Sequence, residues 1–135
     1  MNIRVGCATM VHKDGKLLLG LRGKEPGYGN LIIPGGGVDL YEKLADAAAR
    51  EIREEAGIEI TNLRQFGTYQ LITPDVQHRV IIYWTADWVS GELAPSSDLL
   101  SAKFYTREEI SHEIAKGTIN SITLEVLKDT RWLQR

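Results

Sequence analysis

Three glutamates at helical spacing are the residues of this chain best suited to chemistry. Glu51, Glu54 and Glu55 lie in the run REIREEAGI. Each helical residue turns by about 100°, so Glu54 lies roughly 60° to one side of Glu51 and Glu55 roughly 40° to the other. Carboxylates at this spacing repel one another, and a hard divalent cation with oxygen ligands would offset the repulsion. The charge pattern alone is also typical of a solvated helix face that Arg50 partly neutralises.

The helix that carries these glutamates is predicted over residues 42–56, with Gly57 ending it in a left-handed cap. By the same count, small and aliphatic side chains form a stripe of the width that docks on a core. Its members are Ala45, Ala48, Ala49, Ile52 and Ala56. We therefore expect one side of the helix to pack and the other side to present the carboxylates.

A glycine-rich turn, Pro34-Gly35-Gly36-Gly37, lies between the apolar run 31–33 and this helix. Glycine lets the backbone approach a ligand closely and frees its carbonyls to point into a site. From Gly36 onward the chain reads G, five residues, E, seven residues and then REIREEAGI. This matches every fixed position of the pattern G-x5-E-x7-R-E-U-x-E-E-x-G-U, where U is aliphatic. Residues 36–58 therefore resemble the signature of the Nudix hydrolases.

The resemblance implies hydrolysis of a nucleoside diphosphate linked to another group, because that is the chemistry of the family. It also implies that Mg²⁺, with Mn²⁺ as a substitute, is held by Glu51, Glu54, Glu55 and the carbonyl of Gly36. Either a hydroxide on the metal or one of these carboxylates, Glu51 or Glu54, would take the proton of the attacking water. Asp98 lies in the loop where many relatives carry a carboxylate that orients or deprotonates this water.

Five further residues are candidates for contacts with the substrate or for support of the site. Arg22 ends the run LGLR, where Nudix relatives often place an arginine on phosphate, although a solvated strand end has the same pattern. Tyr28, like Tyr83 and Trp84, has an aromatic face that could stack on a base, or it packs in the core. By the resemblance, Glu42 supports the site without touching the metal.

The sequence leaves the substrate open among several nucleotide classes. Pro74 lies sixteen residues after Ile58, as in relatives similar to ADP-ribose pyrophosphatases, while the compact chain resembles nucleoside-triphosphate pyrophosphohydrolases equally well. A nucleotide-sugar hydrolase of the GDP-mannose type is a third alternative. A module that senses a nucleotide without cutting it is a fourth, but such relatives usually lose a signature glutamate and this chain keeps them all.

The composition predicts one domain, and the resemblance implies a small-molecule nucleotide as its partner. A length of 135 residues suits a single core, and a net charge of −2 gives no electrostatic footprint for a nucleic acid polymer. The single cysteine, Cys7, excludes an internal disulfide and is compatible with a reducing compartment. We see no cationic leader and no apolar run near the ~20 residues of a membrane helix, so we expect no membrane partner and a cytoplasmic protein. Tryptophans that could anchor a homodimer, or equally fill a core, are Trp84, Trp88 and Trp132.

The predicted elements follow the order strands, helix, strands, helices. Strands are expected at residues 3–11, 16–22, 31–33, 58–72, 79–89 and 102–105, and helices at 42–56, from the capping box at Thr106, and at 121–133. This order predicts an α/β fold. With the resemblance, we expect a Nudix-type α/β/α sandwich around a mixed β-sheet, as a single Nudix domain over residues 1–135.

Overall fold

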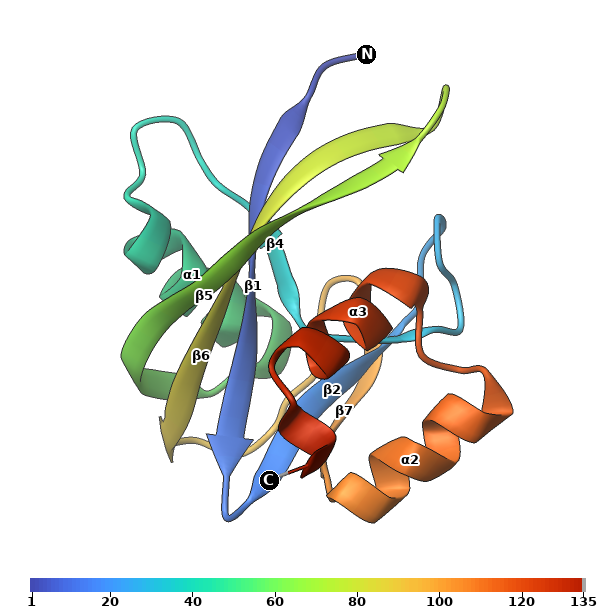
Figure 1. Cartoon of the computed structure of the whole chain (residues 1–135). Helices are drawn as coiled ribbons and strands as arrows, with labels where there is room; N and C mark the ends of the chain where they lie inside the picture. Colours follow the sequence, from blue (N-terminus) through green and yellow to red (C-terminus); the bar gives the residue numbers. More distant parts are fainter. Residues whose placement is uncertain (135) are drawn as a thin grey trace.

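A mixed sheet forms the centre of the protein in the computed structural model, which describes residues 1–134 (Figure 1). Its strands are β1 (Arg4–Lys13), β2 (Lys16–Arg22), β3 (Leu31–Ile32), β4 (Gly35–Gly37), β5 (Glu59–Thr73), β6 (Gln77–Ser90) and β7 (Leu99–Tyr105). The hydrogen-bonded order is β3-β2-β1-β6-β5, with β4 paired to β1 and β7 paired to β2. The expected α/β fold with a mixed sheet is confirmed.

The hairpin that joins β1 and β2 forms where the sequence predicts it. Asp14 and Gly15 both have positive φ, of 52° and 75°, as a two-residue turn of type I′ requires. The turn places Lys13 opposite Lys16 and keeps the apolar side chains of both strands in the core. Local turn chemistry is sufficient to specify this part of the sheet.

β1 lies in the middle of the sheet and pairs with β6 in parallel, from Arg4 opposite Arg79 to His12 opposite Asp87. β5 and β6 form a long antiparallel pair that extends past the rest of the sheet as a twisted ribbon (Figure 1). Asn62 interrupts the regular pairing of β5 with a positive φ of 58° beside a register shift.

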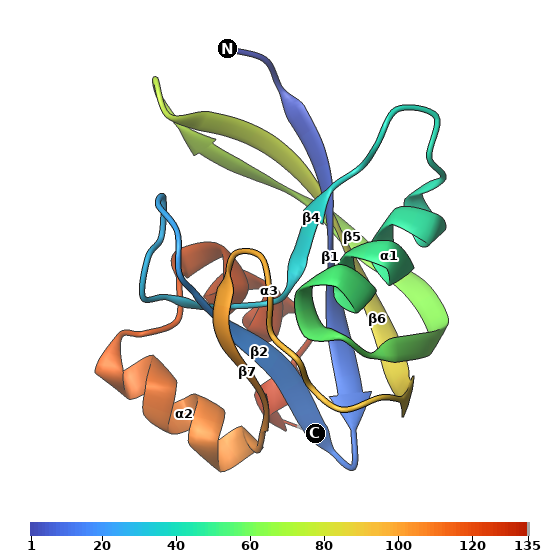
Figure 2. The same cartoon turned by 180° about the vertical axis from the view of Figure 1, so that it is seen from behind.

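Helices cover both faces of the sheet. α1 (Leu44–Ala56) lies on one face, and α3 (Ser121–Asp129) lies on the other, with α2 (Arg107–Lys116) beside it (Figure 2). The core on the α1 side includes Ile52 and the core on the α3 side includes Trp132, both at most 1% exposed. Within residues 1–134, no helix is long and apolar enough to cross a membrane.

The helix ends show which boundaries are determined by local sequence signals. Gly57 caps α1 at a φ of 75°, and the capping box at Thr106 starts α2, as predicted. α1 begins at Leu44, not at residue 42, because Glu42 is used in hydrogen bonds outside the helix. The prediction of a helix over 121–133 is wrong at its end. α3 stops at Asp129, and a separate 3-10 turn, η1 (Trp132–Gln134), follows Arg131 at a φ of 54°.

The predicted docking stripe of α1 is partly wrong. Ile52 and Ala56 are fully buried, but Ala45 is exposed and the buried alanine of the first turn is Ala47. The docked side is rotated because α1 packs against β4 as well as β1. This rotation carries two of the three glutamates into the protein, which the count from the sequence did not anticipate.

Candidate active site

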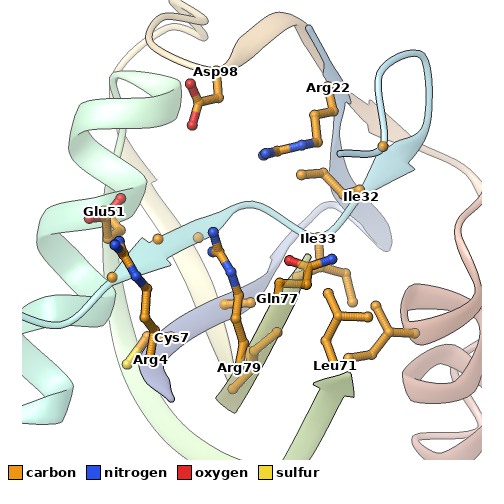
Figure 3. A pocket seen from close by; sticks show the side chains of 18 of the residues that line it. Arg4, Cys7, Arg22, Ile32, Ile33, Glu51, Leu71, Gln77, Arg79 and Asp98 are labelled. Atoms are coloured by element: carbon orange, nitrogen blue, oxygen red, sulfur yellow. The ribbon is translucent and has the colours of Figure 1, made fainter. Parts of the chain in front are cut away.

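A cleft of about 980 Å³ opens where β4, the start of α3 and the loops after β2 and β6 come together (Figure 3). Its charged lining comes from distant parts of the chain. Acidic groups are contributed by α1 and the loop before β7, and basic groups by the ends of β1, β2 and β6. The charged residues named below are Arg4, Arg22, Glu51, Glu54, Glu55, Arg79 and Asp98.

The glycine turn of β4 allows α1 to approach the sheet closely. A Cβ on Gly36 would lie 2.1 Å from Oε2 of Glu51, and a Cβ on Gly35 would lie 1.9 Å from the carbonyl oxygen of Cys7. The contact at Gly35 is with backbone and admits only glycine, whereas a side chain at Gly36 would displace the Glu51 carboxylate. The carboxylate of Glu51 therefore rests directly on the Gly36 backbone.

The three signature glutamates occupy two different environments. Glu51 and Glu55 are buried, at 8% and 6% exposure, whereas the side chain of Glu54 is 56% exposed. Burial raises the pKa of Glu51. Burial, with the nearby charges of Asp98 and Glu51, raises the pKa of Glu55 to about 7. The expectation of three carboxylates on one outward face is wrong for Glu51 and Glu55, because α1 packs against β4 on that side.

Arg50 donates hydrogen bonds to two of these three carboxylates. Its Nη1 donates to Glu51 Oε1 at 2.8 Å and to Glu54 Oε2 at 3.1 Å. Its Nη2 donates to the carbonyl of Gly37 at 2.9 Å, and the same guanidinium holds Glu42. One arginine thus links α1, the glycine turn and the loop between them, and Glu42 acts on the site through it.

The donor set suits a hard divalent cation, because it consists of carboxylate oxygens with a net negative balance. Burial raises the pKa of Glu55, and Asp98 and Glu51 add negative charge around it, so a cation there would relieve both effects. In the described chain, no three histidine, cysteine, aspartate or glutamate side chains are already gathered as a metal cluster. Arg50 holds Glu51 and Glu54 in this arrangement, so cation binding requires these hydrogen bonds to exchange.

The register of β4 on β1 determines which backbone carbonyl of the glycine turn is free to bind a cation. Thr9 N donates to Pro34 O at 3.0 Å, so this facing pair is hydrogen-bonded. Antiparallel pairs alternate, which makes Gly35 a non-bonded position and Gly36 a bonded one. The Gly36 carbonyl therefore faces β1, lying 3.1 Å from where a Cβ of Gly6 would be. The Gly36 ligand stays a prediction, and the register favours the carbonyl of Gly35 beside it.

Arg22 and Asp98 both line the cleft, on either side of its mouth (Figure 3). The backbone joins the two segments, because Gly23 N donates to Asp98 O at 2.8 Å. Arg22 Nε donates to Pro26 O at 2.7 Å, which holds the side chain against its own loop and leaves the rest of the guanidinium toward the cleft. Arg22, Asp98 and Glu55 therefore line the same cleft, and their roles stay predictions.

Tyr28 is not brought to this site. It is 61% exposed at the tip of the loop after β2, and it is absent from the cleft lining. Tyr83 does line the cleft but is 3% exposed in the core, and Trp84 is 6% exposed on the α1 side. The interpretation of Tyr83 and Trp84 as core residues is the one the structure supports.

Two arginines of the cleft, Arg4 and Arg79, were not predicted from the sequence. They lie near the starts of two separate predicted strands, and only the parallel pairing of β1 with β6 brings them side by side. A charged residue at an inward position of an otherwise apolar strand is the one signal that points to Arg79, which precedes the run VIIYW. Cys7 is buried as expected, with Sγ 3.6 Å from the carbonyl of Leu44.

Comparison with known proteins identifies relatives over most of the chain. A family model described as NUDIX domain matches residues 2–126. Among similar proteins, an NAD-capped RNA hydrolase NudC of Vibrio vulnificus is 35% identical over 98 residues, which cover 72% of this chain and 36% of that protein. An ADP-ribose pyrophosphatase of Methanocaldococcus jannaschii is 34% identical over 97 residues, which cover 71% of this chain and 57% of that protein. The chain thus spans less than two thirds of the length of either relative.

Solved structures agree on the fold. A MutT NUDIX hydrolase from Burkholderia pseudomallei has a TM-score of 0.75 and 26% identity, covering 89% of this chain and all of that one. A NUDIX hydrolase from Nitrosomonas europaea has a TM-score of 0.82 at 18% identity, covering 96% of this chain and 89% of that one, and this likeness concerns the fold alone.

Proposed function

The chain belongs to the NUDIX domain family, and on that premise we propose that it is a pyrophosphohydrolase that cuts the diphosphate linkage of a nucleotide derivative with the help of Mg²⁺, or of Mn²⁺ in its place. One observation carries the proposal. The signature glutamates of α1 form one wall of a cleft whose mouth also holds Arg22 and Asp98. Such a cleft combines oxygen ligands for a cation with a cationic group for phosphate.

In this proposal the acidic wall holds the cation. Glu51, Glu54 and Glu55 supply the carboxylate oxygens, and a carbonyl of the glycine turn, Gly35 or Gly36, supplies a backbone ligand. A cation held there would supply positive charge to offset that of the pyrophosphate and would favour deprotonation of the attacking water. Arg50 keeps the carboxylates in place through its hydrogen bonds, which supports a role in positioning.

The remaining groups bind the substrate and move the proton. Arg22 carries a planar guanidinium suited to two phosphate oxygens at once. Asp98 lies close enough to Glu55 for its charge to raise the pKa of that buried carboxyl, so it is placed beside the acidic wall, where it is suited to orient or deprotonate the attacking water. The apolar part of the cleft lining that is still accessible, which includes Ile32, Leu71 and Ile81, offers a surface for a base or sugar.

The substrate class we propose is a small nucleotide, either a nucleoside triphosphate or an ADP-ribose-like diphosphate. The names of the two relatives, ADP-ribose pyrophosphatase and NAD-capped RNA hydrolase, favour a substrate with an adenosine diphosphate linkage. A net charge of −2 gives no general attraction for the body of an RNA, so we expect the nucleotide end alone to be recognised.

The test is a substrate panel assayed with Mg²⁺ and with a chelator in excess. The panel contains ATP, dGTP and its oxidised form, ADP-ribose, NAD, a dinucleoside polyphosphate, GDP-mannose and a short NAD-capped RNA, with products identified by mass. We expect metal-dependent release of a nucleoside monophosphate from one class. If no member is cut while one of them binds tightly, the catalytic proposal fails and a nucleotide-sensing role replaces it.

A further inference from the structure

Two arginines of the cleft have no part in the chemistry described above. Arg4 and Arg79 are directly opposite each other in the parallel register of β1 and β6, and both line the cleft. In the part of the chain that the structure describes, neither forms an ion pair with a carboxylate. Figure 3 shows Arg79 in the middle of the cleft, between Glu51 on one side and Ile33 on the other.

This pair costs stability in the absence of a ligand. Facing residues on neighbouring strands are only about 4.8 Å apart in the hydrogen-bonding direction, and like charges at such positions are destabilising. In addition, Nε of Arg79 is shielded from solvent and has no hydrogen-bond partner. A buried donor without a partner loses its hydration and gains nothing in return. Neither feature is explained by the packing of the sheet.

The arginines also lie on the side of the sheet away from α1. Side chains alternate along a strand, so Arg4 shares a face with Ala8, and Arg79 shares a face with Tyr83. Ala8 and Tyr83 both belong to the core cluster packed against α3. The acidic wall, in contrast, is carried by α1 on the opposite face. The cleft therefore also carries positive charge, contributed by strand ends on the face of the sheet opposite α1. Figure 3 shows the Arg4 side chain reaching toward Glu51 and that of Arg79 in the middle of the cleft.

From this arrangement we infer that Arg4 and Arg79 bind a phosphate group of the substrate that is not part of the linkage being cut. A phosphate between the two guanidinium groups would remove their repulsion and give Arg79 Nε an acceptor. The preferred substrate then carries at least one phosphate beyond the scissile diphosphate. That phosphate is either the terminal group of a nucleoside triphosphate or a phosphomonoester on the ribose. The inference rests on the proposed function, because it concerns the same cleft.

Binding measured without metal tests this directly, since it bypasses the acidic wall. Isothermal titration calorimetry with chelator present compares two ligand pairs, ATP with ADP and adenosine 3′,5′-bisphosphate with AMP. In one pair, we expect the ligand with the extra phosphate to bind the wild-type protein about tenfold or more tightly than its partner ligand. A hydrogen-bonded charged group contributes an amount of this size. The pair that shows the preference identifies the source of the phosphate.

Variants then assign the preference to the two arginines. Arg79→Gln and Arg4→Gln should each reduce the preference to near one, while Arg64→Gln, an exposed arginine of β5 outside the cleft, should leave it unchanged. Arg4 is itself exposed, so its variant is informative even where Arg79→Gln fails to fold. The inference is overturned when neither pair shows a preference, when no ligand binds, or when the preference survives in both variants.

The substrate panel keeps this result separate from the proposed function. If the protein hydrolyses a substrate with metal but shows no arginine-dependent preference for the extra phosphate, the phosphate subsite is refuted and the proposed enzymatic function stands. An arginine-dependent preference without hydrolysis of any member removes the enzyme and leaves a nucleotide-binding cleft.

Discussion

Arg50 grips the carboxylate of Glu42 through two parallel hydrogen bonds, from Nε to Oε2 at 2.7 Å and from Nη2 to Oε1 at 2.9 Å. Together with the backbone N–H of Asp39, this arginine lowers the pKa of Glu42 to about 2. Glu42 thus anchors the guanidinium that holds Glu51 and Glu54. Glu42 is outside the proposed metal-binding set, yet through Arg50 it helps to determine the geometry of that set.

We expect Glu42→Gln to lower kcat by about 10- to 100-fold, the usual cost of removing a group that orients metal ligands. An amide replaces one of the two acceptors by a donor, so the parallel pair of hydrogen bonds is lost. The measurement is kcat over a Mg²⁺ titration, with Asp39→Asn, whose exposed carboxylate lies 3.5 Å from Arg50, as control. Wild-type kcat at every Mg²⁺ concentration would show that Glu42 does not position the site.

Glu54→Gln should lower kcat/KM by roughly three orders of magnitude and leave the Tm almost unchanged. It removes a charge that the proposed cation needs, yet it does so on a side chain that is 56% exposed. Glu59→Gln is a matched control, because Glu59 is also a half-exposed carboxylate paired with an arginine of the same helix, Arg53. A Glu54→Gln variant that retains near wild-type turnover would refute the assignment of the acidic wall.

Gly36→Ala should reduce activity by about 100-fold while the fold persists. The new methyl group would lie 2.1 Å from Glu51 Oε2, so the carboxylate must move, and a shift of about 1 Å in a catalytic geometry has an effect of this size. Gly37→Ala is the control, because a Cβ there meets nothing within 4 Å. Steady-state kinetics measures the activity of both variants, and far-UV circular dichroism checks their fold. Equal activities would show that the close approach of Glu51 to Gly36 is not needed for catalysis.

Ile52→Asp should lower the free energy of unfolding by about 4 kcal/mol or more, since it places an unpaired charge in a fully buried position. Ile72→Asp, at a position that is 55% exposed, should have a small effect. Urea denaturation of the two variants measures both values. An unchanged midpoint for Ile52→Asp would mean that α1 docks through a different face.

Glu109 predicts a specific acid sensitivity of α2. The side chain accepts a hydrogen bond from Lys103 and another, of 2.9 Å, from the backbone of Thr106, and these bonds lower its pKa from 4.5 to about 2. A lowered pKa stabilises the fold above the unfolded value, and the contribution disappears as the pH falls from about 4.5 toward 2.

We therefore expect the Tm of Glu109→Gln to fall less steeply with acidification below pH 5 than that of the wild type. Glu108→Gln, at an exposed neighbouring position outside this network, should keep the wild-type slope. Thermal unfolding followed between pH 6 and pH 3 compares the three proteins. Parallel curves for the wild type and Glu109→Gln would contradict the role of this network.

Local signals in the sequence were enough for most element boundaries. Asp14 and Gly15 specify the first hairpin, Gly57 ends α1, and Thr106 begins α2, because each acts through its own backbone conformation or hydrogen bonds. The end of α3 was missed for the opposite reason, because it depends on surroundings that the local sequence does not reveal. Arg131 takes a left-handed conformation, which a non-glycine residue adopts only when its surroundings favour it.

The composition of the acidic wall was predicted, but its environment was not. A helical count treats every glutamate as solvated, whereas Glu51 is buried because Gly36, which has no side chain, leaves room for its carboxylate. The proposed phosphate-binding pair could not be predicted from the sequence either. Arg4 and Arg79 meet only through a strand register that depends on the whole sheet.

The parallel pairing of β1 with β6 also has a consequence for how the chain folds. β1 is synthesised before the other strands of this sheet and pairs along one edge with residues 79–87, which are made much later. Contacts this distant in sequence require a large loop to close before they stabilise anything, so they slow folding. A nascent chain that has emerged only as far as α1 can form the first hairpin but leaves the inner edge of β1 open. The active-site helix is thus complete well before the sheet on which it must dock.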